Sequence, residues 1–185
     1  MQEELFDQAS DYDAMLNQGL RLSGEDKVYF IEGRLSRLAD LLPTTARPAK
    51  ILDFGCGTGD TSRLLQRRFP EAKIVGVDVS AGAIEHARSE HASAGISFQG
   101  VDEVEGDGTF DLCYCNGAFH HIEPADRAKT VTDLLRLLRP GGFLALFENN
   151  AWHPGTRMVM KRIPFDRDAK PVAPPSARRL LVENG

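Results

Sequence analysis

Residues 51–60 read Ile-Leu-Asp-Phe-Gly-Cys-Gly-Thr-Gly-Asp, and this stretch decides the fold. Ile51, Leu52 and Phe54 supply the apolar side of a short buried strand. Three glycines follow, and beyond them apolar residues recur at helical spacing until Pro70 stops the pattern. The stretch therefore predicts a strand that runs through a glycine-rich turn into a helix.

The glycine turn predicts a binding surface. Gly55, Gly57 and Gly59 tolerate positive φ angles and lack the Cβ atoms that would keep a ligand away from the main chain. A helix that starts at such a turn exposes unpaired N–H groups and the positive end of its dipole. That surface suits an anionic or carboxylate-bearing ligand.

The glycine spacing differs from the dinucleotide fingerprint G-x-G-x-x-G. The third glycine comes one residue earlier here, and Asp53 stands inside the strand, two positions before Gly55. A nicotinamide-dependent oxidoreductase would also need a proton-donating Tyr/Lys or similar pair, which we cannot place in the sequence. The sequence therefore gives only weak support to an NAD-dependent oxidoreductase.

Three strings, D-x-G-C-G-T-G at 53–59, F-D-x-x-x-x-N-G-A-x-H-H-I at 110–122 and L-x-P-G-G-x-L at 138–144, occur in that order. They resemble the class I S-adenosylmethionine-dependent methyltransferases that act on small molecules. The resemblance covers about residues 48–150. It implies a Rossmann-like α/β fold, doubly wound, with a mainly parallel sheet, helices on both faces and an N-terminal helical cap.

The resemblance also implies S-adenosylmethionine as the cofactor. In the family the glycine turn packs against the methionine part, and the acidic strand residue lies close to it. Asp78 follows the turn by about 20 residues, where a carboxylate reaches ribose hydroxyls; Ser80 is the better helix cap. Asp102 resembles the residue that binds the adenine amino group, although a solvated acidic loop explains it equally well. The predicted cofactor-binding residues are Asp53, Gly55, Cys56, Gly57, Thr58, Gly59, Asp78, Val79, Asp102 and Asn116.

Three side chains are predicted to be catalytic: His120, His121 and Glu148. A hydroxyl acceptor benefits from a general base, and histidine titrates near neutral pH. Because adjacent residues at a helix start point in different directions, we expect only one histidine to face the acceptor, and a structural role for both remains open. The acceptor is therefore predicted to be a hydroxyl oxygen, and no spacing typical of metal ligands is present.

Composition indicates one globular domain over residues 1–185, divided into a cap (1–47), a cofactor-binding core (48–150) and an incomplete acceptor-side segment (151–185). The net charge of −5 argues against nucleic-acid binding. No segment is long and apolar enough for a membrane span, and the odd count of three cysteines favours reduced thiols in a cytoplasm. A small molecule is therefore the expected partner.

The cap contains a predicted helix with Val28, Ile31 and Leu35 on one face and Ser23 as its N-cap. Aromatic faces attract cations, so Tyr12, Tyr29 or Phe30 can face the sulfonium or the acceptor, with core packing as the equal alternative. Pro124 is expected in the first turn of a later helix.

The last segment is basic and suits an acidic or carrier-bound acceptor, unless it is only a solvated face. Its basic residues are Arg157, Lys161, Arg162, Arg167, Lys170, Arg178 and Arg179. The strand pair with which the family completes its sheet is missing from this sequence. Either the sequence is a shortened form of the chain, or residues 143–147 form an exposed edge that favours a homo-oligomer or, as a second alternative, a cofactor-binding but inactive partner subunit.

Overall fold

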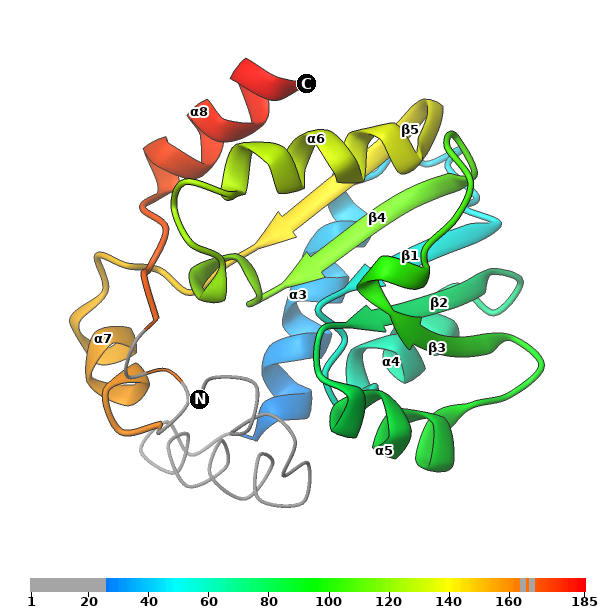
Figure 1. The fold of residues 1–185 in the computed structure, drawn as a ribbon, viewed down its shortest axis with the longest axis horizontal. Helices are drawn as coiled ribbons and strands as arrows, with labels where there is room; N and C mark the ends of the chain where they lie inside the picture. Colours follow the sequence, from blue (N-terminus) through cyan, green and yellow to red (C-terminus); the bar gives the residue numbers. More distant parts are fainter. Residues whose placement is uncertain (1–25, 164–165, 167–168) are drawn as a thin grey trace.

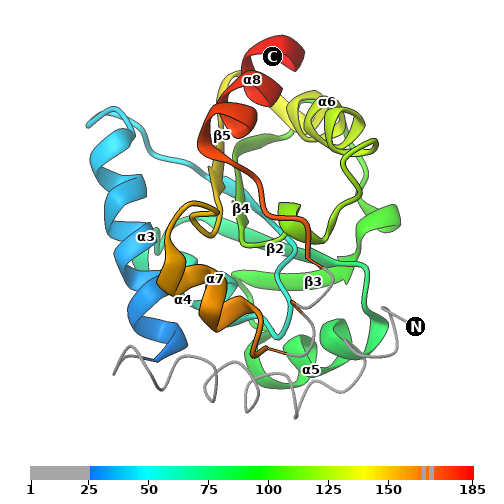
Figure 2. The ribbon, with the colours of Figure 1, turned by 90° about the vertical axis from the view of Figure 1, so that its left-hand side faces the viewer.

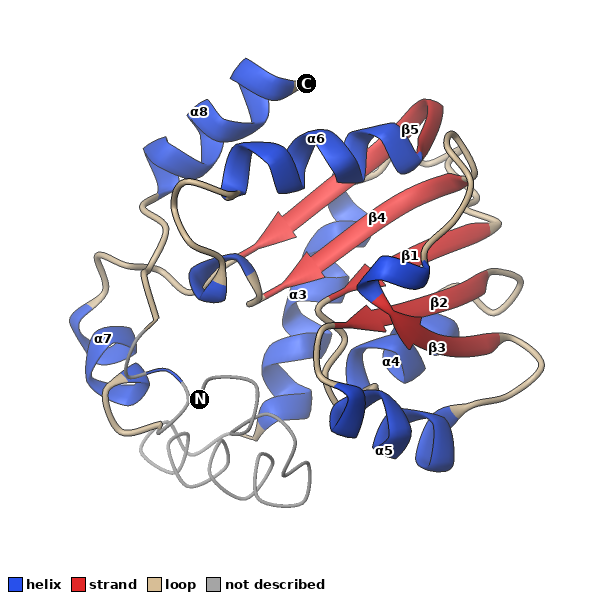
Figure 3. Ribbon diagram, viewed as in Figure 1, coloured by secondary structure: helices blue, strands red, loops and turns tan. Residues whose placement is uncertain are grey.

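Five parallel strands form one sheet in a computed structural model that describes residues 26–163, 166 and 169–185 (Figure 1). The strands are β1 Lys50–Phe54, β2 Lys73–Asp78, β3 Ile96–Gly100, β4 Phe110–Asn116 and β5 Leu138–Phe147. Their spatial order is β3-β2-β1-β4-β5, and every neighbouring pair is parallel (Figure 3). The sheet reverses its winding direction beside β1, as doubly wound folds do.

Helices cover both faces of this sheet. The helices are α3 Lys27–Leu41, α4 Asp60–Arg68, α5 Ala81–His91, α6 Arg127–Leu137, α7 Pro154–Met160 and α8 Pro174–Asn184, with short 3-10 turns η1 Val101–Glu103 and η2 Phe119–His121. The first three pack on one face, and α6 and α8 pack on the other. Helix α7 lies beyond the carboxyl ends of β4 and β5 (Figures 1 and 2). The predicted Rossmann-like α/β class is confirmed.

The strands are apolar on both sides because both faces are covered. Ile51 and Leu112 belong to the core cluster under α3, α4 and α5. Their neighbours Leu52 and Cys113 belong to the cluster under α6 and α8. All four are fully buried, and this alternation along β1 and β4 fixes which side chains reach which layer.

Two expectations about helix starts are confirmed. Helix α4 begins at Asp60, directly after the glycine turn. Ser80 caps α5, where its hydroxyl accepts a hydrogen bond from Ala83 N at 3.1 Å. Both starts are encoded locally, by a glycine turn and by a capping side chain, so short-range sequence signals suffice.

Two other expectations are not met. Pro124 precedes α6, which begins at Arg127, because residues 123–126 form a separate turn closed by Asp126 N donating to Glu123 O at 2.9 Å. Ser23 and Tyr12 lie outside the described residues. The N-cap of α3 is Asp26, whose Oδ1 accepts from Tyr29 N at 2.8 Å.

Strand β5 forms one edge of the sheet in the described part of the chain. The L-x-P-G-G-x-L string at residues 138–144 lies within the strand itself. Leu138 pairs with Phe110 and Phe143 pairs with Leu112, so the register shifts between the two pairs. Phe143 is 37% exposed at this edge.

Candidate active site

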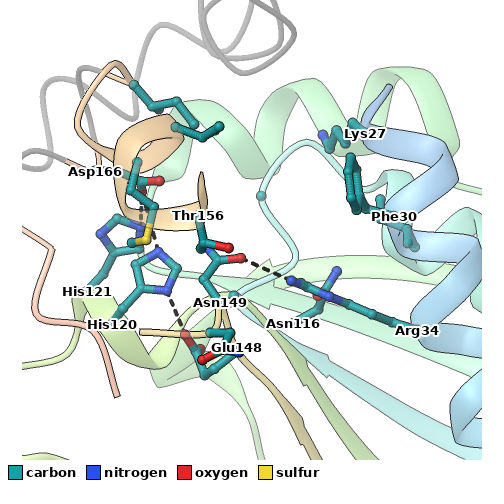
Figure 4. Close-up of a pocket in the computed structure, with 18 of the residues that line it drawn as sticks. Lys27, Phe30, Arg34, Asn116, His120, His121, Glu148, Asn149, Thr156 and Asp166 are labelled. Carbon is teal, nitrogen blue, oxygen red and sulfur yellow. Dashed lines mark hydrogen bonds and ion pairs between the residues drawn. The ribbon is translucent and has the colours of Figure 1, made fainter. Parts of the chain in front are cut away.

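A cavity of about 650 Å³ lies at the carboxyl ends of β1, β4 and β5, between α3 and α7 (Figure 4). In open α/β sheets ligands bind at this end of the strands, beside the reversal in strand order. One wall is the glycine turn, and the opposite wall contains His120, His121, Glu148 and Asp166. The strand ends thus bring together motifs that are far apart in the sequence.

The three glycines of the turn have different roles. All have positive φ angles: 73° at Gly55, 52° at Gly57 and 90° at Gly59. A Cβ atom on Gly57 would meet nothing within 4 Å, and Gly55 and Gly57 both line the cavity. A Cβ on Gly59 would approach Phe98 to 2.9 Å. The second glycine therefore leaves main chain open toward the cavity, and the third allows the helix to pack.

Asp78 is tied to this turn. Gly57 N donates to its Oδ2 at 2.9 Å, and Ser80 N donates to its Oδ1 at 3.0 Å. Each carboxylate oxygen keeps lone-pair capacity for a further donor. Val79, the next residue, is 72% exposed. A direct hydrogen bond thus joins the two parts of the predicted cofactor site, the turn and Asp78.

Asp53 lies beneath the turn and is 1% exposed. Its Oδ2 accepts a hydrogen bond from Ser62 Oγ at 2.7 Å. Burial raises the pKa of Asp53 to about 7, and Asp78 adds to this effect, while the Ser62 hydroxyl and Lys27 oppose it. A carboxyl group held in this state is costly to ionise, and such groups concentrate at functional sites.

Helix α3 supplies two cations to the cavity (Figure 4). Lys27 Nζ donates to Thr58 Oγ1 at 3.0 Å and pairs with Asp60 at 2.9 Å, so it connects α3 to the glycine turn. Arg34 donates to the side-chain oxygens of Asn116 and of Asn149, the latter at 3.0 Å. Burial lowers the pKa of Arg34, and no carboxylate of the described residues lies within 4 Å of it.

His120 is 3% exposed and held from both sides by carboxylates. Its Nδ1 lies 2.7 Å from Glu148 Oε2, and Phe119 N donates to the other oxygen of Glu148 at 2.8 Å. Its Nε2 lies 3.4 Å from Asp166 Oδ1. Burial lowers the pKa of His120, but the contacts with Asp166 and Glu148 outweigh it and raise the pKa to about 9.

His121 shares the same carboxylate. Its Nε2 lies 3.3 Å from Asp166 Oδ1, and the two imidazole rings are 4.2 Å apart. Burial raises the pKa of Asp166, but the two histidines outweigh it and hold that pKa below its ordinary value. Both rings lie on one wall of the cavity beside Asp166, so the adjacent histidines do not point in different directions (Figure 4). Which of them faces the acceptor stays a prediction.

Sequence comparison identifies the family. A family model described as a methyltransferase domain matches residues 51–142. A trans-aconitate 2-methyltransferase from Methylobacterium nodulans is 33% identical over 83% of this chain and 57% of the relative. The chain belongs to the class I S-adenosylmethionine-dependent methyltransferases. A malonyl-[acyl-carrier protein] O-methyltransferase from Acetivibrio thermocellus is 37% identical over 51% of this chain and 34% of the relative. The chain thus spans 57% of the length of the first relative and 34% of the second.

Solved structures share the fold. Phosphoethanolamine N-methyltransferase 2 of Haemonchus contortus, in complex with S-adenosyl-L-methionine, has a TM-score of 0.63 and 19% identity, and covers 83% of this chain and 36% of that one. The [4+2]-cyclase SpnF has a TM-score of 0.61 and 21% identity, and covers 82% of this chain and 56% of that one. Since a cyclase also has this fold, the reaction must be argued from the site. No helix of the described residues is long and apolar enough to cross a membrane.

The cavity collects most of the residues predicted from the sequence. Lining it are Gly55, Cys56, Gly57, Thr58, Asn116, His120, His121 and Glu148. Outside its lining are Asp53, Gly59, Asp78, Val79 and Asp102. Of these, Asp53 is buried beneath the turn, and Asp102 lies exposed in η1. The roles assigned to these residues in binding and catalysis stay predictions.

Three charged pocket residues, Lys27, Arg34 and Asp166, were missed. Arg34 sits among the apolar positions of α3, and nothing in its local pattern separates it from an ordinary surface arginine. Asp166 lies far along the chain from His120 and His121, so no short spacing could associate the three. The described basic residues of the last segment do not line the cavity; Lys27 and Arg34 of the N-terminal helix provide its cations.

Proposed function

We propose that this chain transfers a methyl group from S-adenosylmethionine to an oxygen of a small-molecule acceptor that carries a carboxylate. One observation supports this above the others: a single cavity joins the glycine turn to Arg34, which has no carboxylate partner among the described residues. A half-buried cation in such a position favours an anionic ligand.

The residues at the turn fit the cofactor. The space beside Gly57 is open to the cavity, so an amino acid group can approach the main chain there. Asp78 retains acceptor capacity for ribose hydroxyls, and Asp102 is proposed to meet the adenine amino group. When bound, S-adenosylmethionine supplies an electrophilic methyl group on a positively charged sulfur.

The protein's main contribution is alignment. An acceptor oxygen must attack the methyl carbon in line with the breaking carbon–sulfur bond, and positioning of this kind is worth up to roughly 7–11 kcal/mol. Arg34 would orient the acceptor through its carboxylate, and Asn116 and Asn149 hold the guanidinium in place. Glu148 orients the imidazole of His120 on the acceptor side. The names of two relatives, which include trans-aconitate and malonyl-[acyl-carrier protein], agree with an acidic acceptor, free or carrier-bound.

The test is a methyl-transfer assay with labelled cofactor and two matched groups of acceptors, small carboxylic acids and neutral alcohols of similar size. We expect turnover with the acids, and a rise in acceptor KM of at least tenfold in Arg34→Met, with Arg37→Met on the exposed side of α3 as the control. Turnover with the alcohols alone would restore the predicted hydroxyl acceptor and refute the carboxylate. Cofactor binding without turnover of any acceptor would favour the inactive-subunit alternative.

Calorimetry with S-adenosylhomocysteine is the necessary companion, since Arg34 could instead hold the carboxylate of the cofactor. If Arg34→Met weakens that binding and leaves the acceptor KM unchanged, Arg34 belongs to the cofactor and the argument for an acidic acceptor fails. If it changes KM and leaves cofactor binding intact, the assignment to the acceptor stands. The family assignment makes NAD binding the unexpected result.

We also propose that the edge of β5 pairs with a second copy of the chain in the cytoplasm. Backbone groups at a sheet edge are open to further pairing, and Phe143 is partly exposed there. The cysteines Cys56, Cys113 and Cys115 are free and buried, in agreement with a reducing compartment. Light scattering of the full chain tests the pairing, and a monomer at micromolar concentration would refute it.

A further inference from the structure

The contacts around Asp166 have two different kinds of geometry. The contact of His120 Nδ1 with Glu148 is 2.7 Å, the length of a charge-assisted hydrogen bond. The distances from Asp166 Oδ1 to the Nε2 atoms of His120 and His121 are 3.4 and 3.3 Å, longer than the usual range for such bonds. Asp166 Oδ1 is buried and makes no hydrogen bond with the described residues.

The tautomer of His120 decides whether its contact with Asp166 Oδ1 is attractive or repulsive. If Nδ1–H donates to Glu148, a neutral His120 presents the lone pair of Nε2 toward the lone pairs of Asp166 Oδ1. His121 brings another Nε2 to the same oxygen. The one ligand atom that each residue offers lies within 4.8 Å of the other two. One metal ion can be shared by all three atoms.

The distances match such an ion. Two ligand atoms bound to a tetrahedral ion at about 2.0–2.1 Å are separated by about 3.3–3.4 Å. Two imidazole nitrogens and one carboxylate oxygen suit zinc and its first-row neighbours, whereas magnesium and calcium prefer oxygen ligands alone. Metal-bound histidines typically donate their other ring N–H to a carboxylate, and Glu148 occupies that position for His120.

We propose that His120 Nε2, His121 Nε2 and Asp166 Oδ1 bind one divalent first-row transition-metal ion, with zinc as the reference ion. All three residues line the cavity assigned to the acceptor (Figure 4), so an ion held by them would lie within reach of an acceptor there. An ion there would bind the acceptor oxygen as a Lewis acid. That role rests on the proposed function, but metal binding itself does not. The site departs from the sequence expectation of no metal.

The experiment is a zinc titration of the full chain, stripped with a chelator and dialysed, by calorimetry without S-adenosylmethionine. We expect one saturable site per chain. Asp166→Asn should weaken zinc binding by more than 100-fold, and Glu148→Gln, which acts through His120, by about 10–100-fold. His153→Asn is the matched control, because His153 lines the same cavity, lies outside the three ligands and caps α7 as asparagine also can.

Cobalt gives a readout that needs no variant. The wild-type chain loaded with Co²⁺ should show the visible absorption of a tetrahedral nitrogen–oxygen site, and zinc should displace it. Failure to bind either ion, or zinc binding that Asp166→Asn leaves unchanged, would overturn the proposal. Because cofactor binding is measured separately on the metal-free chain, a failure of the metal site is distinguishable from a failure of the proposed methyl transfer.

Discussion

Replacing Asp53 with asparagine should change how the stability of the protein depends on pH. In the folded chain burial raises the pKa of Asp53 to about 7, against an ordinary value of 3.8. An acid with a raised folded pKa contributes most below its unfolded pKa, and its contribution falls as pH rises through the window from 3.8 to about 7. The wild-type protein should therefore lose stability from this group as pH rises.

The size of the effect follows from the two pKa values. Each pKa unit corresponds to about 1.36 kcal/mol, so the difference between the folded and unfolded pKa of Asp53 lowers stability by about 4 kcal/mol at pH 8 and by only about 1–2 kcal/mol at pH 5, where the folded chain keeps the group protonated. Asparagine does not titrate, and its side-chain oxygen can still accept from Ser62. Between pH 5 and 8 the stability of Asp53→Asn relative to wild type should rise by about 2–3 kcal/mol.

Urea denaturation of both proteins at pH 5 and pH 8, without cofactor, measures this difference. Ser62→Ala is the companion variant: the hydroxyl opposes the raised pKa, so its loss should extend the window to higher pH. Parallel pH curves for wild type and Asp53→Asn would refute the reasoning. The same variant should bind S-adenosylmethionine more weakly if Asp53 serves the cofactor.

Three further predictions concern single contacts. The methyl group of Gly57→Ala has room, but the residue needs a φ of 52°, so the variant should be about 1–2 kcal/mol less stable in a thermal melt. It should also bind S-adenosylhomocysteine more weakly in calorimetry. Unchanged binding would remove Gly57 from the cofactor site. Asp26→Ala should lose about 1 kcal/mol through the cap of α3 and Asp26→Ser almost nothing, whereas equal losses would contradict a capping role. Glu148→Gln should lower kcat by about 10–100-fold with little change in cofactor affinity, and an unaltered kcat would show that His120 needs no orientation.

The strand–turn–helix core could be predicted because its signals are local. The apolar run before Gly55, the glycines themselves and the capping hydroxyl of Ser80 each act within a few residues of where they stand. The right-handedness of parallel connections then decides on which face of the sheet each connecting helix lies. Pro124 misled because a proline suits both a helix start and a turn, and its local sequence does not separate the two.

The acceptor side of the pocket was only half predictable. His120, His121 and Glu148 follow strand ends, which the alternation of strands and helices places at one edge of the sheet. Arg34 and Asp166 reach the same cavity from segments outside that alternation, and only packing brings them there. The shared carboxylate also explains why both histidines turn inward, a long-range effect that adjacent positions in a sequence cannot reveal.

The hydrogen bond from Gly57 N to Asp78 has a kinetic and thermodynamic consequence. It holds the glycine turn in its bent shape before any nucleoside arrives, so little backbone entropy remains to be lost on association. The turn is in this respect preorganised, and cofactor binding should need no slow rearrangement of it. If Asp78 also binds the ribose, as proposed, the same carboxylate shapes the turn and holds the sugar, so a single substitution at position 78 should disturb both.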